Sequence, residues 1–171
     1  MTVSERYASR RLIAVGSLAL VAVVGFDLLL HAGALSRLYS QQTPFLLPAE
    51  SAFRRIPLGY ASFALLVVLL EWLIVRLGRE GLRQGAVFGL QLGGLIWFSL
   101  ALGLASISTA RPSLLVGWAV GQTIELGVAG AVLGKGLVSV SLRGLTWRVL
   151  TFFVTCAIAG VVLQNLLVPL R

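Results

Sequence analysis

The chain carries little charge and has few acidic residues. Of its 171 residues, 12% are charged and only 6 are Asp or Glu, whereas 58% are hydrophobic. Soluble domains usually contain about a quarter charged residues, which keep their surface hydrated. This composition excludes an ordinary soluble domain and predicts an integral membrane protein.

Residues that build cross-links, metal clusters and haem sites are also scarce. The chain has 1 cysteine, Cys156, and 1 histidine, His31. A single cysteine excludes a disulfide or a thiolate metal cluster within one chain, and a single histidine excludes bis-histidine haem ligation within it. The sequence contains no GxGxxG, phosphate-binding-loop or HExxH pattern. We therefore predict no cofactor.

Five long segments almost free of charge alternate with more polar connections. Crossing about 30 Å of hydrocarbon takes roughly 20 helical residues, a length that each segment reaches or approaches. We therefore predict an all-α integral membrane protein, with a five-helix transmembrane bundle in one domain over 1–171. The predicted helices cover about 12–34, 57–76, 85–107, 113–134 and 149–169, and an outer interfacial loop covers 36–56. The short connection between the second and third helices predicts that these two pack as antiparallel neighbours.

The basic residues lie at the ends of these segments. The net charge is +8, and nine of the 14 Lys and Arg residues fall on the side of the N-terminus when the five segments alternate in direction. Lys and Arg collect on the cytoplasmic side of membrane proteins. We therefore predict a multi-pass protein of the cell inner (plasma) membrane with a cytoplasmic N-terminus and a C-terminus outside. Topology accounts for the positive charge, and we predict no nucleic-acid partner.

Glycines recur at four-residue spacing in two of the predicted helices. Gly85, Gly89 and Gly93 share one face of the third helix, and Gly117 and Gly121 share one face of the fourth. Such faces let helix backbones approach closely in lipid. Because further glycines within 127–134 point the opposite way, we predict that the fourth helix is central. The same faces are candidate contacts for a homo-oligomer or a larger membrane complex.

Polar side chains inside the predicted spans are the main functional signal. A charged side chain near the centre of a membrane helix costs at least about 2.5 kcal/mol, so it needs a partner or a hydrated cavity. Asp27 and His31 lie four residues apart on one face of the first helix, and Glu125 lies near the middle of the fourth. The candidate ligand- or proton-binding residues are Asp27, His31, Tyr60, Trp118, Gln122 and Glu125.

We expect these residues to form a polar pocket, open to the outer side, that binds or transports a small polar solute or cation, with coupling to protons as one option. Imidazole and carboxyl groups can hold and pass protons, and we predict no catalytic residue. Two other functions stay open. One is a non-catalytic membrane subunit or scaffold that packs on a larger complex, and the other is a membrane enzyme with a metal held by Asp27, His31 and Glu125. The Asp27–His31 pair also has a purely structural interpretation, as a bond that fixes the first helix.

Overall fold

The computed structural model describes residues 8–40 and 44–167, in which every regular element is a helix. The π-helical turn η1 continues α2 without a break, and α3 and α4 are short. The elements are α2 (Ser9–Asp27), η1 (Leu28–Ala34), α3 (Ser36–Tyr39), α4 (Ala49–Arg54), α5 (Ile56–Leu77), α6 (Leu82–Ile107), α7 (Pro112–Val138) and α8 (Arg143–Leu167).

Five of these helices are long and apolar enough to cross a membrane, namely α2 together with η1, α5, α6, α7 and α8. The predicted all-α class and the five long helices are thus confirmed. Four helix ends lie three or more residues beyond the approximate predicted ones: the first helix begins at Ser9, the third begins at Leu82, the fourth extends to Val138 and the fifth begins at Arg143. Basic residues near these ends remain helical, because a long basic side chain can reach water from within a helix. Residues 168–169 of the fifth predicted helix lie outside the described residues.

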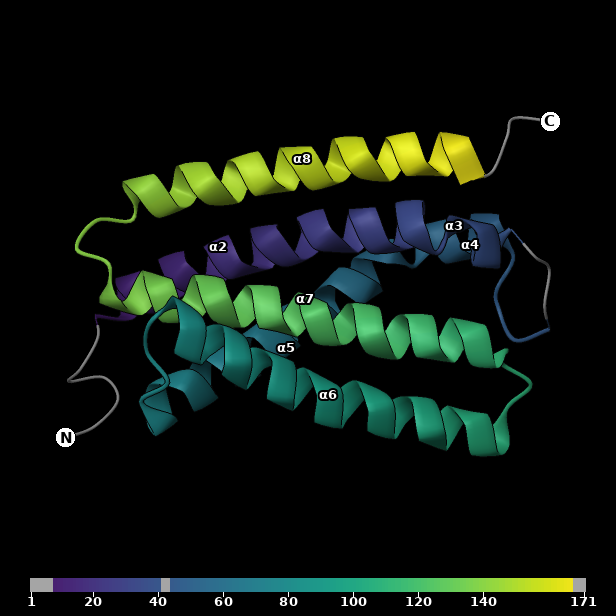
Figure 1. Ribbon diagram of the computed structural model, residues 1–171, viewed down its shortest axis with the longest axis horizontal. Coiled ribbons are helices and arrows are strands. Elements are labelled where there is room, and N and C mark those ends of the chain that lie inside the picture. The colour runs from purple at the N-terminus through teal and green to yellow at the C-terminus, as the bar shows by residue number, and fades with distance from the viewer. Residues whose placement is uncertain (1–7, 41–43, 168–171) are drawn as a thin grey trace.

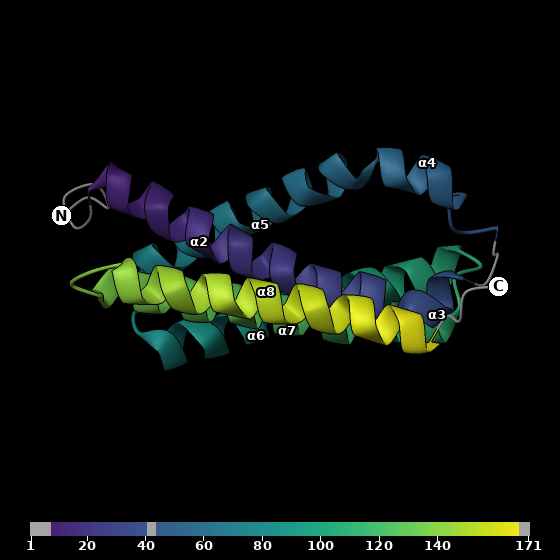
Figure 2. The same cartoon turned by 90° about the horizontal axis from the view of Figure 1, so that it is seen from above.

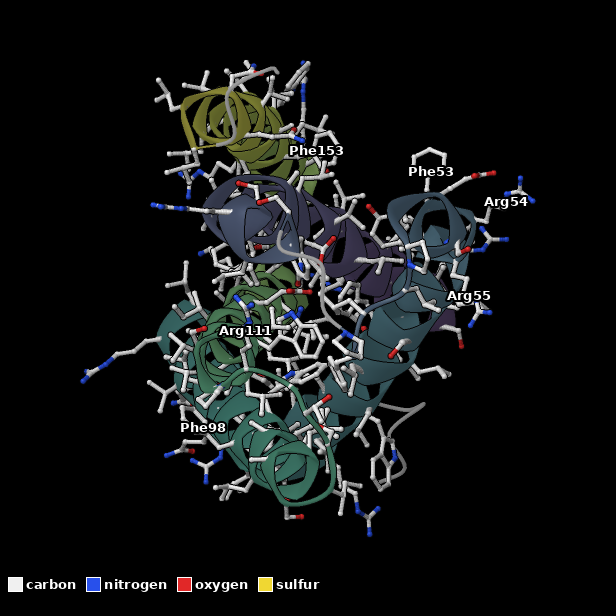
Figure 3. All side chains as sticks on the ribbon, turned by 90° about the vertical axis from the view of Figure 1, so that its right-hand side faces the viewer. Phe53, Arg54, Arg55, Phe98, Arg111 and Phe153 are labelled. Atoms are coloured by element: carbon white, nitrogen blue, oxygen red, sulfur yellow. The ribbon has the colours of Figure 1, made fainter. Side chains whose placement is uncertain are left out.

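Four helices lie side by side in the order α8, α2, α7, α6, and α5 crosses on one side of this row (Figure 1). The view along the bundle in Figure 3 shows the same order. Figure 2 shows that α5 leans away from the other helices towards its beginning, where α4 lies. We call this the α4 end of the bundle and the opposite end the N-terminal end.

Two glycine-rich faces hold α6 against α7. A Cβ atom added to Gly85 would collide with the carbonyl oxygen of Gly130, and one added to Gly89 would collide with that of Leu126. The Gly81 N–H donates a hydrogen bond of 2.9 Å to Gly134 O across the same seam. The two helices therefore touch backbone to backbone, as expected for glycines at this spacing.

The opposite side of α7 receives larger side chains. The methyl groups of Leu35 and Leu30 fill the space where Cβ atoms on Gly117 and Gly121 would lie. This confirms that the fourth predicted helix is packed on two sides. The glycine faces are thus occupied within the chain, so an oligomer would have to use other surfaces.

The buried core explains where α5 lies. Its largest fully buried apolar side chains come from α2, α5 and α7, and are Val15, Val23, Leu70, Ile74 and Leu133. These contacts hold the second half of α5 on α2 and α7, while α6 touches α5 mainly near the turn at Gly78 and Gly81, which both have positive φ. The expectation that the second and third helices pack along each other is therefore wrong, because the glycine face of α6 fits α7 instead.

Candidate functional site: a cavity at the α4 end

The divergence of α5 from the other helices leaves a cavity of about 760 Å³ at the α4 end. This volume lies within the range of small-molecule sites. Polar residues of the lining are Asp27, His31, Tyr39, Tyr60 and Trp118. The apolar part of the lining consists of Leu28, Ala32, Phe45, Leu46, Leu47, Ala52, Phe53, Ile56, Gly59 and Phe63. The cavity is therefore apolar over most of its wall, with one cluster of polar groups.

A hydrogen-bonded network centred on His31 forms the polar cluster. Its Nδ1 atom lies 2.6 Å from Tyr39 Oη, and its Nε2 atom lies 2.9 Å from Gln122 Nε2. The carboxylate oxygen Oδ1 of Asp27 lies 3.3 Å from the same Nε2 atom. Trp118 Nε1 donates a further hydrogen bond to Tyr39 Oη. The network thus joins α2, η1, α3 and α7.

Tyr39 closes the network at the α4 end. Burial raises the pKa of its phenol to about 12, so the group is a neutral O–H at physiological pH. The indole N–H of Trp118 can only donate, which makes Tyr39 Oη an acceptor for this contact. When His31 Nδ1–H also donates to Tyr39, the phenolic hydrogen of Tyr39 is left to bind another acceptor.

The network admits two arrangements of its protons. In the first, His31 carries its proton on Nδ1, and Nε2 accepts from the Gln122 amide and from a protonated Asp27 carboxyl. In the second, Nε2–H donates to an ionised Asp27, Gln122 presents its carbonyl oxygen, and Tyr39 donates to Nδ1. The two arrangements share the same atomic positions except at the Gln122 amide, whose nitrogen and oxygen exchange places. A proton can therefore leave Asp27 without any rearrangement of the helices.

The wide turn η1 brings His31 and Tyr39 together. The Leu35 N–H bonds to Leu30 O at 2.8 Å, five residues back instead of four. Turns of this kind are rare and occur frequently at functional sites. Helix α8 packs directly behind the turn, since a Cβ on Gly160 would lie 2.8 Å from Leu28 O. The turn is thus held from the side opposite the cavity.

Glu125 lies in the wall behind the cavity rather than on its surface. The residue is 2% exposed, and its Oε2 atom has no hydrogen-bond partner among the described residues. Its carboxyl group interacts electrostatically with Asp27, and Tyr60 interacts with both carboxyl groups. An unpartnered carboxyl in an apolar interior is costly. Because this cost is not offset at Oε2 by a hydrogen bond from the described residues, we consider a functional role for Glu125.

The structure brings the predicted site residues together to different degrees. Asp27, His31, Tyr60 and Trp118 line the cavity, Gln122 bonds to His31, and Glu125 lies behind them. Within the described residues, no group of three His, Cys, Asp or Glu side chains is placed to hold a metal ion. The three residues considered for a metal site are thus not arranged as a ligand set here.

Sequence reasoning missed Tyr39 and the aromatic wall. We assigned 36–56 to an interfacial loop, whereas its described parts include α3 and α4, and Phe45 and Phe53 from this segment line the cavity. The available signal was the spacing of eight residues between His31 and Tyr39, about two helical turns, if the first helix is continued beyond Ala34.

The arrangement can bind a ligand at the polar cluster, enclose its apolar part, and exchange a proton at Asp27. Comparison of the chain with protein families, with curated proteins and with solved structures finds no match.

Proposed function

We propose that the chain is a multi-pass inner-membrane protein that binds a small polar solute or cation in the cavity at the α4 end and transports it in exchange for protons. In this proposal the N-terminus is cytoplasmic and the C-terminus and the cavity face outward. The observation that carries it is a cavity of ligand size whose polar groups belong to one hydrogen-bonded network around His31.

The charge of the lining supports an exchange between cation and proton. Asp27 is its only acidic residue, and none of the lining residues identified in 8–40 and 44–167 is Lys or Arg. In an apolar environment a carboxylate without a counter-charge is costly even with a hydrogen bond from His31, so a bound proton or a bound cation stabilises it. Binding of a cation at Asp27 therefore releases a proton, and acidification releases the cation.

In this proposal, two more carboxyl groups carry protons between the cavity and the N-terminal end. Glu125 is the next group after Asp27. Glu71 on α5 comes after it and lies against α2 at Gly16, where an added Cβ would be 2.9 Å from Glu71 Oε2. Gly16 precedes Asp27 by 11 residues, or roughly 16 Å along a helix. Glu71 Oε1 is also buried without a hydrogen-bond partner among the described residues. Carboxyl groups within membrane helices commonly form proton relays.

Replacing Asp27 by Asn is expected to abolish proton exchange. The test uses proteoliposomes with an internal pH dye, to which tetramethylammonium or benzyltrimethylammonium chloride is added outside. The parent should alkalinise the vesicle interior as the cation enters and protons leave. Asp27→Asn should show no more than the leak of empty vesicles, because the amide cannot release a proton.

Glu50→Gln is the matched control for Asp27→Asn. It removes one carboxylate from α4 at a site with 81% side-chain exposure, where Glu50 pairs with Arg54 at 2.7 Å. This variant should behave like the parent. If neither cation causes proton movement in parent vesicles, the proposed function is contradicted. The same holds if Asp27→Asn vesicles move as many protons as the parent.

The proposed topology has its own test. Reporter fusions after residue 5 and after residue 171 should place the first site in the cytoplasm and the second outside. An odd number of membrane crossings requires the two ends to lie on opposite sides. Cytoplasmic signals from both fusions would refute the five-span arrangement.

The scaffold and metal-enzyme alternatives receive less support from the geometry. A scaffold docking through the glycine faces would need these faces on the surface, whereas Gly85 and Gly89 contact α7. A metal enzyme would need converging ligands, whereas Asp27 and His31 form a pair whose remaining contacts are Gln122 and Tyr39.

A further inference from the structure

We infer that the cavity takes a hydrophobic organic cation, a substituted ammonium with an aromatic or aliphatic body, rather than a small hydrated ion. This inference rests on the proposed function and names its substrate class. It follows from three properties of the cavity: the sign of its charge, the chemistry of its wall and the exposure of part of that wall.

The polar cluster favours a cationic group. Asp27 has a side chain that is 13% exposed, so it is both accessible from the cavity and largely removed from water. Two arginines at the end of α4 face away. Arg54 is engaged by Glu50, and both Arg54 and Arg55 project outward from the helices (Figure 3). Because no Lys or Arg is among the described residues that line the cavity, a cation at Asp27 meets an acidic group without a basic side chain in the same wall.

Aromatic rings line the same cavity as Asp27. Tyr39, Tyr60 and Trp118 come from three different elements, and Phe45 lies with its ring centroid 6.0 Å from that of Trp118. Aromatic faces attract ammonium groups, and the attraction grows when the group is desolvated. A small metal ion would gain little from such a wall, because it requires several oxygen ligands to replace its water.

Part of the apolar wall of the cavity lies at the surface of the chain. Leu47, Phe53 and Ile56 line it and are also exposed, by 47%, 74% and 42% respectively. In a bilayer these side chains face the outer leaflet rather than water. An amphiphile dissolved in that leaflet can therefore enter between α4 and η1. Once bound, its apolar body would lie along the apolar wall and its ammonium group would contact Asp27.

The experiment measures binding to the full chain in nanodiscs by isothermal titration, with empty nanodiscs as a blank. Benzyltrimethylammonium is the main probe. Tetramethylammonium lacks its phenyl group, and phenylmethanesulfonate has a similar shape with the opposite charge. We expect benzyltrimethylammonium to bind about 10- to 100-fold more tightly than tetramethylammonium, because burial of the phenyl ring adds to binding. Phenylmethanesulfonate should not bind, and affinity for the cation should fall as the pH is lowered.

Variants distinguish the two parts of the cavity. Asp27→Asn should abolish binding of the cation, and Phe45→Leu should weaken it about two- to tenfold, since an apolar side chain remains but the aromatic face is lost. The control for Phe45→Leu is Phe98→Leu on α6, whose side chain is exposed and lies outside the cavity (Figure 3). Phe98→Leu should bind like the parent. If Asp27→Asn does not fold, Phe45→Leu and the anion still test the inference.

Each of the other outcomes would refute one part of the argument. Equal affinity for tetramethylammonium and benzyltrimethylammonium would refute the hydrophobic substrate class and leave proton-coupled transport of a small cation in place. Binding of phenylmethanesulfonate as tight as that of the cation would refute the charge argument. Failure of both cations to bind, together with absence of proton exchange in vesicles, would refute the proposed function itself.

Discussion

Gly89→Leu is expected to cause a large loss of stability of the bundle. Even the first atom of the new side chain would collide with the carbonyl oxygen of Leu126, so α6 and α7 must separate. Overpacking of an interior commonly costs about 1–3 kcal/mol and can cost more, a large fraction of a typical total stability of about 5–15 kcal/mol. Thermal unfolding in detergent, followed by circular dichroism, should show a much lower midpoint or no folded state.

The comparison variants separate a backbone collision from a general effect of substitution. Gly103→Ala lies on the same helix with open space where its Cβ would be, and should melt close to the parent. Leu100→Ile changes only side-chain shape at an exposed position and should also be mild. Gly121→Ala should have a melting midpoint between that of Gly89→Leu and those of the mild variants. The obstacle there is the movable side chain of Leu30 rather than a backbone carbonyl. A parent-like midpoint for Gly89→Leu would show that α6 and α7 do not pack through this face.

Glu125→Gln is expected to abolish proton exchange while leaving the fold as stable as the parent or more stable. The amide has nearly the shape of the carboxyl group but cannot transfer its proton. Because Glu125 Oε2 has no partner among the described residues, removal of the acid breaks no hydrogen bond. A buried polar group without a partner commonly costs about 1–3 kcal/mol, so Glu125→Leu should raise the free energy of unfolding. A purely structural carboxyl would show the opposite pattern, with lower stability and intact exchange.

Histidine NMR provides a second readout for the same residue. His31 is the only histidine, so its ring signals need no assignment by mutation. If Glu125, Asp27 and His31 belong to one titrating group, the pH dependence of the His31 signals should change in Glu125→Gln. An unchanged titration would reduce Asp27 and His31 to a local structural pair, which is the interpretation that favours a scaffold.

The long helices and the main packing faces could be predicted because they depend on regular patterns. Charge-free runs define the five long helices, and four-residue glycine spacing predicts the seam at Gly85 and Gly89, which the structure confirms. Helix ends were less predictable. Arg143 and Arg148 look like connection residues by charge alone, yet both lie in α8, because a flexible basic side chain can reach water from within a helix.

The candidate site was partly predictable for a similar reason. The spacing of Asp27 and His31 places them on one helical face, and the structure shows their side chains 3.3 Å apart. Tyr39 was missed because regular α-helical geometry does not foresee a wide turn between it and His31. The aromatic wall was missed because the position of the segment before α4 depends on contacts between residues distant in the sequence, such as that of Phe45 with Trp118, which periodicity does not encode.

The wide turn η1 makes the site depend on the number of residues as well as on their type. One residue of an α-helix corresponds to a rotation of about 100°. The wide turn holds one residue more than an α-helical turn, so a deletion within Leu28–Ala34 can be absorbed by a return to regular α-helix with little change in the phase of Tyr39. A residue inserted between His31 and Tyr39 has no such outlet and would rotate Tyr39 away from His31 by about 100°. Homologous chains that keep the network are therefore expected to tolerate loss of the wide turn but not a longer chain between His31 and Tyr39.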